Sequence, residues 1–413
     1  MFGPAALALL CLLLVVGVAT RQEPLTLFAL ALVLAALVSQ LWRRYCLTGV
    51  EYRRRLDRRR VAFGETLQME VEVVNRKLLP LAWLRIFDEL PDGARPARGR
   101  VYSSHRAGRL VLDAVLAMRP FERVRRFHPI PCHQRGGFEV GPVRLSSGDL
   151  FGLVTRETEL DDRESFVVWP RVVPLADPDL PARQPLGELK SRSWLFEDPA
   201  RIAGAREFRP GDPTRRVHWP ASVRTQRLLA KVYEPTTSRR LVLALNLNPS
   251  ESWTFEDYDA EVVEFTIMVA ASAACWALEQ GYEVGLVANG IHRNGDLGVV
   301  VAASAGPAQR ERVLDALGKL QAVAVQPFER TLEDAVRTLR FGTSVVLVSA
   351  ALGTKAAAQV EALHRKGHAL ALLHTGPGRV AARSLPRGVV VRRAAGGHRT
   401  WRDMSTVDLV GVR

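Results

Sequence analysis

Two nearly uninterrupted apolar runs, Phe2–Thr20 and Leu25–Trp42, open the chain and are separated only by Arg21-Gln22-Glu23-Pro24. At about 1.5 Å per residue, a helix over either run would span roughly 27 Å, close to the hydrocarbon thickness of a bilayer. Pro24 and its charged neighbours suit a turn at the interface. We therefore predict a transmembrane helical hairpin over residues 1–42. A cleaved signal peptide is the competing interpretation of the first run, but no Lys or Arg precedes it.

A cluster of arginines follows the hairpin in residues 43–60, where only Glu51 and Asp57 oppose them. The members are Arg43, Arg44, Arg53, Arg54, Arg55, Arg58, Arg59 and Arg60. By the positive-inside rule this segment and the amino terminus stay cytoplasmic. We expect a basic juxtamembrane segment that rests on anionic headgroups at about 1 kcal/mol per residue. The predicted location is the inner (plasma) membrane, multi-pass, with residues 43–413 in the cytoplasm.

Apolar and polar residues alternate over short stretches of residues 61–173, as in Leu67–Val73 and Arg109–Leu116, with Pro and Gly clusters between them. This pattern predicts antiparallel strands, and a β-sandwich domain is the simplest closure. His105, His128 and His133 lack a regular ligand spacing and are expected to be solvated or hydrogen-bonded strand residues rather than metal ligands.

From residue 235 to residue 413 the pattern changes to buried strands that alternate with amphipathic helices. Leu241–Leu245 predicts a buried strand, Tyr258–Gln280 a helix closed by Gly281, and Tyr282–Val287 the next strand. The alternation continues through Val299–Ala303, Ala308–Leu320, Leu332–Leu339, Ser344–Ser349, Ala356–Lys366 and His368–Leu373. Alternating strands and helices predict a doubly wound parallel sheet, so the expected fold class is α/β and β multi-domain.

Composition narrows the class of protein further. The chain has 413 residues, of which 47% are hydrophobic and 24% charged, with no signature of disorder. Its four cysteines are scattered, which supports neither a disulfide framework nor a CxxC metal site. The formal net charge of +14 is compatible with nucleic acid, an anionic membrane surface or an acidic protein as partner.

Residues 174–234 are predicted to connect the two domains, and they contain the most unusual segment of the chain, Arg206–Trp219. Within it, Pro210-Gly211-Asp212-Pro213 predicts a turn that leads into a helix, with Asp212 as the cap and Pro213 at the first helical position. The arginines around this turn suit three roles: pairing with carboxylates of a neighbouring domain, docking an acidic partner, or binding phosphate.

Together with Ala221–Thr225 and Leu228–Glu234, this segment resembles the signature of the bacterial domain-of-unknown-function family 58, which is close to R-E-Y-R-P-G-D-P-x-R-R-I-H-W-K-A-S-A-R-T. Pro220 departs from the pattern at the position of Lys, and we expect it to stop or kink a helix there. A second matching block is Arg135–Val143, Gly148–Leu153 and Val167–Arg171. The resemblance covers residues 50 to 413.

Ligand sites in such sheets lie at the carboxyl ends of strands, here the loop Asn246–Ser250, which holds neither GxxxxGK[ST] nor GxGxxG. The family resemblance implies a von Willebrand factor A-like domain over residues 235–413, whose metal motif is D-x-S-x-S. Asn246 replaces the Asp, Asn248 replaces the first Ser, Ser250 remains, and Thr331 is the candidate for the distal Thr. Without an anionic ligand we expect no bound metal and no cofactor. These side chains then cap and satisfy the loop, or form a metal-free protein contact.

The predicted function is a non-enzymatic, membrane-tethered interaction or assembly protein, for which the resemblance implies a MoxR-type AAA+ ATPase as partner. Glu207 and Asp212 are expected to orient the arginines, while His218 and Trp219 pack against the last domain. The candidate binding residues are Arg206, Glu207, Arg209, Gly211, Asp212, Arg215, Arg216, His218 and Trp219.

Two alternatives remain open. Nucleic acid or another anionic ligand is a less favoured partner for the arginine-rich segment, and steep salt dependence would identify it. A Ser-His-Asp set drawn from Ser250, His374 and Asp257 lacks the G-x-S-x-G elbow, so no catalytic residue is predicted.

Overall fold

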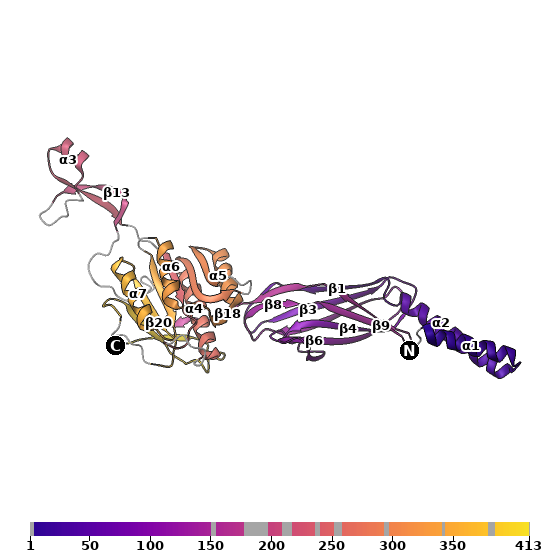
Figure 1. Cartoon of the computed structure of the whole chain (residues 1–413). Coiled ribbons are helices and arrows are strands. Elements are labelled where there is room, and N and C mark those ends of the chain that lie inside the picture. The colour runs from indigo at the N-terminus through magenta and orange to yellow at the C-terminus, as the bar shows by residue number, and fades with distance from the viewer. Residues whose placement is uncertain are drawn as a thin grey trace. The chain divides into compact units, whose positions relative to one another are not determined.

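The computed structural model describes residues 4–149, 154–176, 197–208, 217–235, 240–251, 258–292, 297–340, 343–378 and 385–412 (Figure 1). The chain divides into two compact units, Met1–Pro170 and Arg171–Arg413. The second unit therefore begins slightly before the predicted connector. The reason is that β12 (Leu175–Ala176) pairs with β22 (Val407–Gly411), which ties the predicted connector to the last sheet.

The first unit begins with two apolar helices, α1 (Pro4–Ala19) and α2 (Glu23–Tyr45), which pack on each other as the predicted hairpin. Pro24 lies in the first turn of α2 rather than in the connecting turn, because proline needs no N–H partner there. Helix α2 is long and apolar enough to cross a membrane. Helix α4 (Ala260–Glu279) passes the same test, but it is mostly buried and belongs to the core of the second unit.

The rest of the first unit is built mainly from antiparallel strands, which confirms the predicted strand pattern, although β2 and β11 pair in parallel. One sheet has the order β1-β3-β7 and a second has the order β10-β9-β4-β6-β5. Their inward residues form a single core that includes Leu67, Met69, Leu84 and Ile130. The strands are β1 (Val50–Leu56), β3 (Thr66–Asn75), β4 (Leu81–Pro91), β5 (Arg100–Ser103), β6 (Arg109–Met118), β7 (Arg123–Pro131), β9 (Val143–Gly148) and β10 (Thr155–Leu160). A small third sheet joins β2 (Arg60–Val61), β11 (Glu164–Val168) and β8 (Gly136–Val140).

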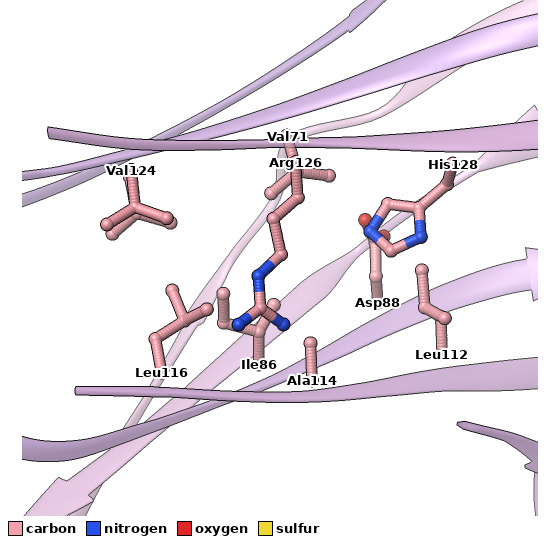
Figure 2. A pocket seen from close by; sticks show the side chains of 10 residues that line it. Val71, Ile86, Asp88, Leu112, Ala114, Leu116, Val124, Arg126 and His128 are labelled. Carbon is pink, nitrogen blue, oxygen red and sulfur yellow. The ribbon is translucent and has the colours of Figure 1, made fainter. Parts of the chain in front are cut away.

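The space between the two larger sheets is small. Figure 2 shows a space between the sheets that is lined by apolar side chains such as Val71 and Ile86, with Asp88, Arg126 and His128 reaching it. Its volume is about 10 Å³. That is enough for about one water molecule and far below the few hundred Å³ of ordinary ligand pockets.

The sandwich includes part of the segment predicted to be a basic juxtamembrane region. Strand β1 pairs with β3 from Val50↔Asn75 to Leu56↔Met69. Its side chains alternate, so Tyr52 and Arg54 point inward while Arg53 and Arg55 are exposed. The prediction that Arg54 contacts headgroups is wrong. Side chains along a strand point alternately to its two faces, and Arg54 lies on the face that is turned inward.

The second unit contains a mixed sheet of order β12-β22-β21-β20-β19-β15-β16-β17. Its central strands are parallel, as predicted, whereas β17 and β22 are antiparallel to their neighbours β16 and β21. The further strands are β15 (Arg240–Leu245), β16 (Glu283–His292), β17 (Leu297–Ser304), β18 (Leu320–Ala324), β19 (Ser344–Ser349), β20 (Leu370–His374) and β21 (Val390–Ala394).

Helices cover both faces of this sheet. Val242 and Ala244 of β15 pack with Leu332 of α6 (Phe328–Thr338) and Val360 of α7 (Thr354–Arg365). Helices α4 and α5 (Pro307–Lys319) contact each other and other strand positions of the sheet. The predicted end of α4 at Gly281 is confirmed, because Gly281 has φ 79°. The helix starts two residues later than predicted, where the Asp259 carboxylate caps it by accepting the Glu261 N–H at 2.9 Å.

Candidate functional site

The loop Asn246–Ser250 leaves the carboxyl end of β15 at the point where the strand order reverses. Strand β16, which follows β15 in the parallel order, lies on one side of it, and β19 lies on the other. Ligands of open α/β sheets bind at such switch points. The structure therefore places Asn246 at the edge where the sequence analysis expected it.

The side-chain amide of Asn246 is fully hydrogen-bonded. Its nitrogen donates to the Ser349 hydroxyl at 2.9 Å and to the Ala351 carbonyl at 3.1 Å. Its oxygen accepts the Asn248 N–H at 3.0 Å and the Asn289 amide at 2.9 Å. An amide has two N–H donors and two lone pairs, so no bonding capacity of Asn246 is left over.

Asn289 extends this arrangement across the sheet edge to Thr331. Asn289 is completely buried, and its oxygen accepts the Leu247 N–H at 2.8 Å. Its nitrogen also reaches the Gln326 carbonyl at 3.3 Å, and the Gln326 amide donates to the Thr331 hydroxyl at 2.9 Å. We call Asn246, Asn289, Gln326, Thr331 and Ser349 the amide network. Asn289 and Gln326 were not predicted from the sequence, although Asn289 lies within the buried run of β16.

The other two predicted positions shape the loop itself. The Asn248 oxygen accepts the Ser250 N–H at 3.4 Å, two residues further along the chain. Such short-range bonds from an Asn side chain stabilise a turn of the backbone. Asn248 and Ser250 therefore act here as the loop-satisfying residues that the sequence analysis described.

The amide network does not fit the divalent metal that the family resemblance implies. Mg²⁺ takes oxygen ligands in near-octahedral geometry and is usually held by one or two carboxylates. In the network the Asn246 oxygen already accepts two hydrogen bonds, and its amide nitrogen faces Ser349. No group of three or more His, Cys, Asp or Glu residues that would hold a metal occurs among the described residues.

The Ser-His-Asp alternative would use His374 as its base. The His374 Nε2 lies 3.1 Å from the Gly378 carbonyl, and the ring is buried. Burial lowers the pKa of His374, so the ring resists taking up a proton. Asp257 lies outside the described residues.

The signature segment forms a β-hairpin that carries a short helix. Strand β13 (Glu197–Glu207) pairs with β14 (Leu229–Pro235) in the register Arg206↔Ala230 and Glu207↔Leu229. Helix α3 (Trp219–Thr225) lies between them, and we call the whole element the signature hairpin. Of its predicted binding residues, Arg209, Gly211, Asp212, Arg215 and Arg216 lie outside the described residues.

Helix α3 is fixed by His218 and Ser222. The His218 Nδ1 accepts the Ala221 N–H at 3.2 Å, so His218 caps the helix. The Ser222 hydroxyl donates to the His218 carbonyl at 3.0 Å and accepts the Leu229 N–H at 2.9 Å, which ties α3 to β14. Pro220 lies in the first turn of α3, so it begins this helix where a stop or kink was predicted.

The outer surface of α3 is apolar and basic. Trp219 is 64% exposed and Val223 is 76% exposed. The prediction that Trp219 packs against the last domain is therefore wrong. Arg224 is exposed on the same helix, and Arg227 pairs with Glu207 at 3.2 Å. Arg206 donates to the Glu207 carbonyl at 3.0 Å.

A buried ion pair in the sandwich was not identified from the sequence. The Arg54 guanidinium donates to the Asp88 carboxylate at 2.5 Å, and the Tyr52 hydroxyl donates to the same carboxylate at 2.6 Å. Both charged side chains are almost completely buried. Burial raises the pKa of Tyr52, which keeps its hydroxyl a donor. These contacts hold β1 against β4 inside the sandwich.

One family model matches a range of the chain that includes both candidate regions. Residues 204–377 match the family model described as "Protein of unknown function DUF58", and this range holds most of the signature hairpin and the whole amide network. The chain is 24% identical over 253 residues to the uncharacterized protein YeaD of Bacillus subtilis (strain 168). That match covers 60% of this chain and 58% of the relative, so the chain spans less than two thirds of the relative's length.

Two solved structures are similar to part of the chain. The CARDB domain of a Pyrococcus furiosus protein is 13% identical, with 29% of this chain and 84% of that chain covered and a TM-score of 0.20. A cohesin module from a Clostridium perfringens glycoside hydrolase is 8% identical, with 28% and 96% covered and the same TM-score of 0.20. A TM-score of this size carries no argument about fold or function.

Proposed function

We propose that this protein is a non-enzymatic, membrane-tethered interaction protein and that its signature hairpin docks an acidic protein partner. The observation that carries the proposal is the exposed surface of α3. There Trp219 and Val223 project from a helix that is tied down by Ser222, and Arg224 lies beside them. Aromatic anchors with neighbouring arginines are the residues that dominate protein interfaces.

A von Willebrand factor A-like scaffold for this hairpin is part of the proposal. The order β17-β16-β15-β19-β20-β21, with β17 antiparallel at its end, supports such a scaffold. The amide network supports a metal-free version of it, because neutral amides take the place of the acidic ligand. In such a domain, the partner has to be recognised by side chains of the protein surface and not by a bound metal.

Attachment to the membrane is supported by α2, which has the length and apolarity of a membrane span. Arg43 and Arg44 lie in its last turn, where cations favour both the helix dipole and the cytoplasmic interface. We propose that α1 and α2 span the inner membrane and that residues 43–413 are cytoplasmic. The resemblance to family 58 makes a MoxR-type AAA+ ATPase the partner to test.

The test measures binding of the MoxR-type ATPase from the same cell to the full-length chain in detergent, with and without nucleotide. Val223→Asp places a charge in the proposed interface, whereas Val300→Asp is a matched control on β17, since Val300 is 71% exposed. We expect Val223→Asp and Trp219→Ala to weaken binding about 30-fold, the cost of a hot-spot residue of about 2 kcal/mol. Val300→Asp should leave the affinity unchanged.

Three results would reject parts of this proposal. If the wild-type chain does not bind the ATPase, the named partner is rejected. Equal weakening by Val223→Asp and Val300→Asp would move the interface away from α3. Tight binding of nucleic acid that falls steeply with salt and is lost in Arg224→Glu would favour the nucleic-acid alternative.

A further inference from the structure

Two loops at one end of the sandwich are held together by a buried asparagine. Residues 76–80 join β3 to β4, and residues 119–122 join β6 to β7. Asn75, which is completely buried, donates to the Leu79 carbonyl at 3.0 Å and to the Arg119 carbonyl at 2.9 Å. Its backbone N–H donates to the Glu122 carbonyl at 2.9 Å. The two loops therefore form one surface, which we call the α2-proximal loops.

These loops are bonded directly to the end of α2, which leads into this end of the sandwich (Figure 1). The Lys77 ammonium donates to the carbonyl of Cys46, the residue that ends α2, and to the Thr48 carbonyl at 2.9 Å. The Arg76 N–H donates to the Gly49 carbonyl at 2.8 Å. Any bilayer that α2 crosses therefore has its surface next to the α2-proximal loops.

A second set of contacts holds α2 itself against the sandwich. The Ser39 hydroxyl donates to the Asp149 carboxylate at 3.1 Å, and Arg156 donates to the Arg44 carbonyl at 2.7 Å. The Trp83 indole N–H donates to the Asp149 carbonyl at 3.0 Å. Because these bonds span the last two turns of α2, the end of the sandwich lies at the depth where the helix leaves the apolar phase.

The tips of the α2-proximal loops are large apolar side chains that the sandwich does not bury. Leu78 is 79% exposed and Phe121 is 64% exposed. Phe121 also has φ 56°, which is a left-handed backbone conformation. This conformation is unfavourable in free energy for residues that have a Cβ and is mainly adopted by Gly, Asn or Asp. The strained backbone thus holds an aromatic ring out in solvent, where it gains no packing within the chain.

Basic groups lie on the α2-proximal loops and in the last turn of α2. Arg43, Arg44 and Arg119 are exposed, and no ion pair links them to any residue that the structure describes. The acidic residues at this end are already engaged: Glu51 pairs with Arg76 at 2.6 Å, and the Glu122 carboxylate accepts the Arg119 N–H at 2.6 Å. Apolar loop tips on a surface that also carries cations are complementary to the surface of an anionic bilayer.

We propose that the α2-proximal loops are a second membrane contact, in which Leu78 and Phe121 enter the headgroup region of an anionic phospholipid bilayer while Arg119 binds lipid phosphate. This inference rests on the proposed membrane anchor. It adds a consequence for function: the sandwich is attached to the membrane at the loops as well as through α2, which fixes its angle to the bilayer.

The test places a nitroxide label at single positions of the full-length chain in vesicles of phosphatidylglycerol and phosphatidylcholine. Cys46, Cys132 and Cys275 are buried, so a Cys11→Ser background leaves no exposed native thiol. Leu78→Cys and Phe121→Cys report on the loops. Phe127→Cys is the matched control, because Phe127 is 62% exposed but lies further along β7. A label in lipid relaxes faster with oxygen than with a water-soluble nickel complex, and a label in water shows the reverse.

We expect the labels at positions 78 and 121 to be at least 5-fold more accessible to oxygen, relative to nickel, than the label at 127. Replacing phosphatidylglycerol by phosphatidylcholine, or introducing Arg119→Glu, should reduce this ratio. If the labels at 78 and 121 are as accessible to nickel as the label at 127, the inference is overturned. It is also overturned if their protection appears in detergent and increases with protein concentration, since a second copy of the chain then covers the loops.

The wild-type chain separates this inference from the proposed anchor. Its exposed thiol is Cys11, which lies on α1. A Cys11 label that is accessible to oxygen, together with loop labels in water, would reject only the second contact. A Cys11 label that is accessible to nickel would reject the anchor itself.

Discussion

The substitution Asn246→Asp tests whether the amide network is a structural clamp or a concealed metal site. It replaces the amide nitrogen that donates to the Ser349 hydroxyl and the Ala351 carbonyl by a second oxygen. The two bonds accepted from Asn248 and Asn289 remain available. The change is nearly isosteric, so its effect reports on charge and hydrogen bonding rather than on volume.

The magnitude follows from the contacts that are lost. Two donated hydrogen bonds account for about 2 kcal/mol. A carboxylate at a site that is only 5% exposed adds the cost of an uncompensated buried charge, which by itself reaches about 3 kcal/mol when a buried partner is absent. Part of this cost is avoided by protonation, so we expect a net loss of about 3 kcal/mol in the local stability of β15 and β19.

Amide hydrogen exchange of the full-length chain in detergent measures this loss, because exchange of peptides from β15 and β19 reports the free energy of their opening. A loss of about 3 kcal/mol speeds exchange more than 100-fold. Asn75→Asp is the matched control, since Asn75 is a buried asparagine of the other unit. It should speed exchange in β3 and leave β15 unchanged.

Two results would refute this reasoning. The first is a less than 10-fold change in exchange for Asn246→Asp in the absence of divalent metal, which would mean that the donated bonds carry little free energy. The second is slower exchange of β15 in the wild-type chain upon addition of millimolar Mg²⁺. In that case the neutral network binds a cation despite its satisfied oxygens.

Three further predictions concern the sandwich, the signature hairpin and the pH response. Arg54→Met breaks the buried pair with Asp88 and should destabilise the first unit by about 3 to 5 kcal/mol. Arg53→Met, at an exposed neighbour, should change the stability by less than about 0.5 kcal/mol. Hydrogen exchange of β1 and β4 measures both effects. Ser222→Ala removes the link between α3 and β14 and should lower the free energy of opening at the Leu229 amide, read from its hydrogen exchange, by about 1 to 2 kcal/mol. Thr225→Ala, at an exposed site of the same helix, should leave this free energy unchanged. Equal effects of the two substitutions would contradict the role of Ser222. Burial lowers the pKa of His374, so as the pH falls below about 6.5 the unfolded chain binds a proton more readily than the folded chain, and the free energy of unfolding decreases. Hydrogen exchange of β20 should become faster as the pH falls, after correction for intrinsic exchange, in the wild type but not in His374→Gln.

The sequence by itself determined the parts of this protein that depend on near neighbours. The apolar run of β15 and the end of α4 at Gly281 are encoded within a few residues, and the structure has them as predicted. The apolar lengths of α1 and α2 and the period of two in β3 are of the same kind. Each is a repeat that an isolated segment carries, so its side chains specify the element without reference to the rest of the chain.

The tertiary structure decided which distant groups meet. Asn246 is hydrogen-bonded to Asn289 of β16 and Ser349 of β19. Arg54 forms an ion pair with Asp88 across the sandwich. The exposure of Trp219, for which packing had been predicted, belongs here too, because it depends on what the rest of the fold leaves uncovered. Strand order and register set these encounters, and both arise from burial summed over whole sheets, so no short stretch of residues encodes them.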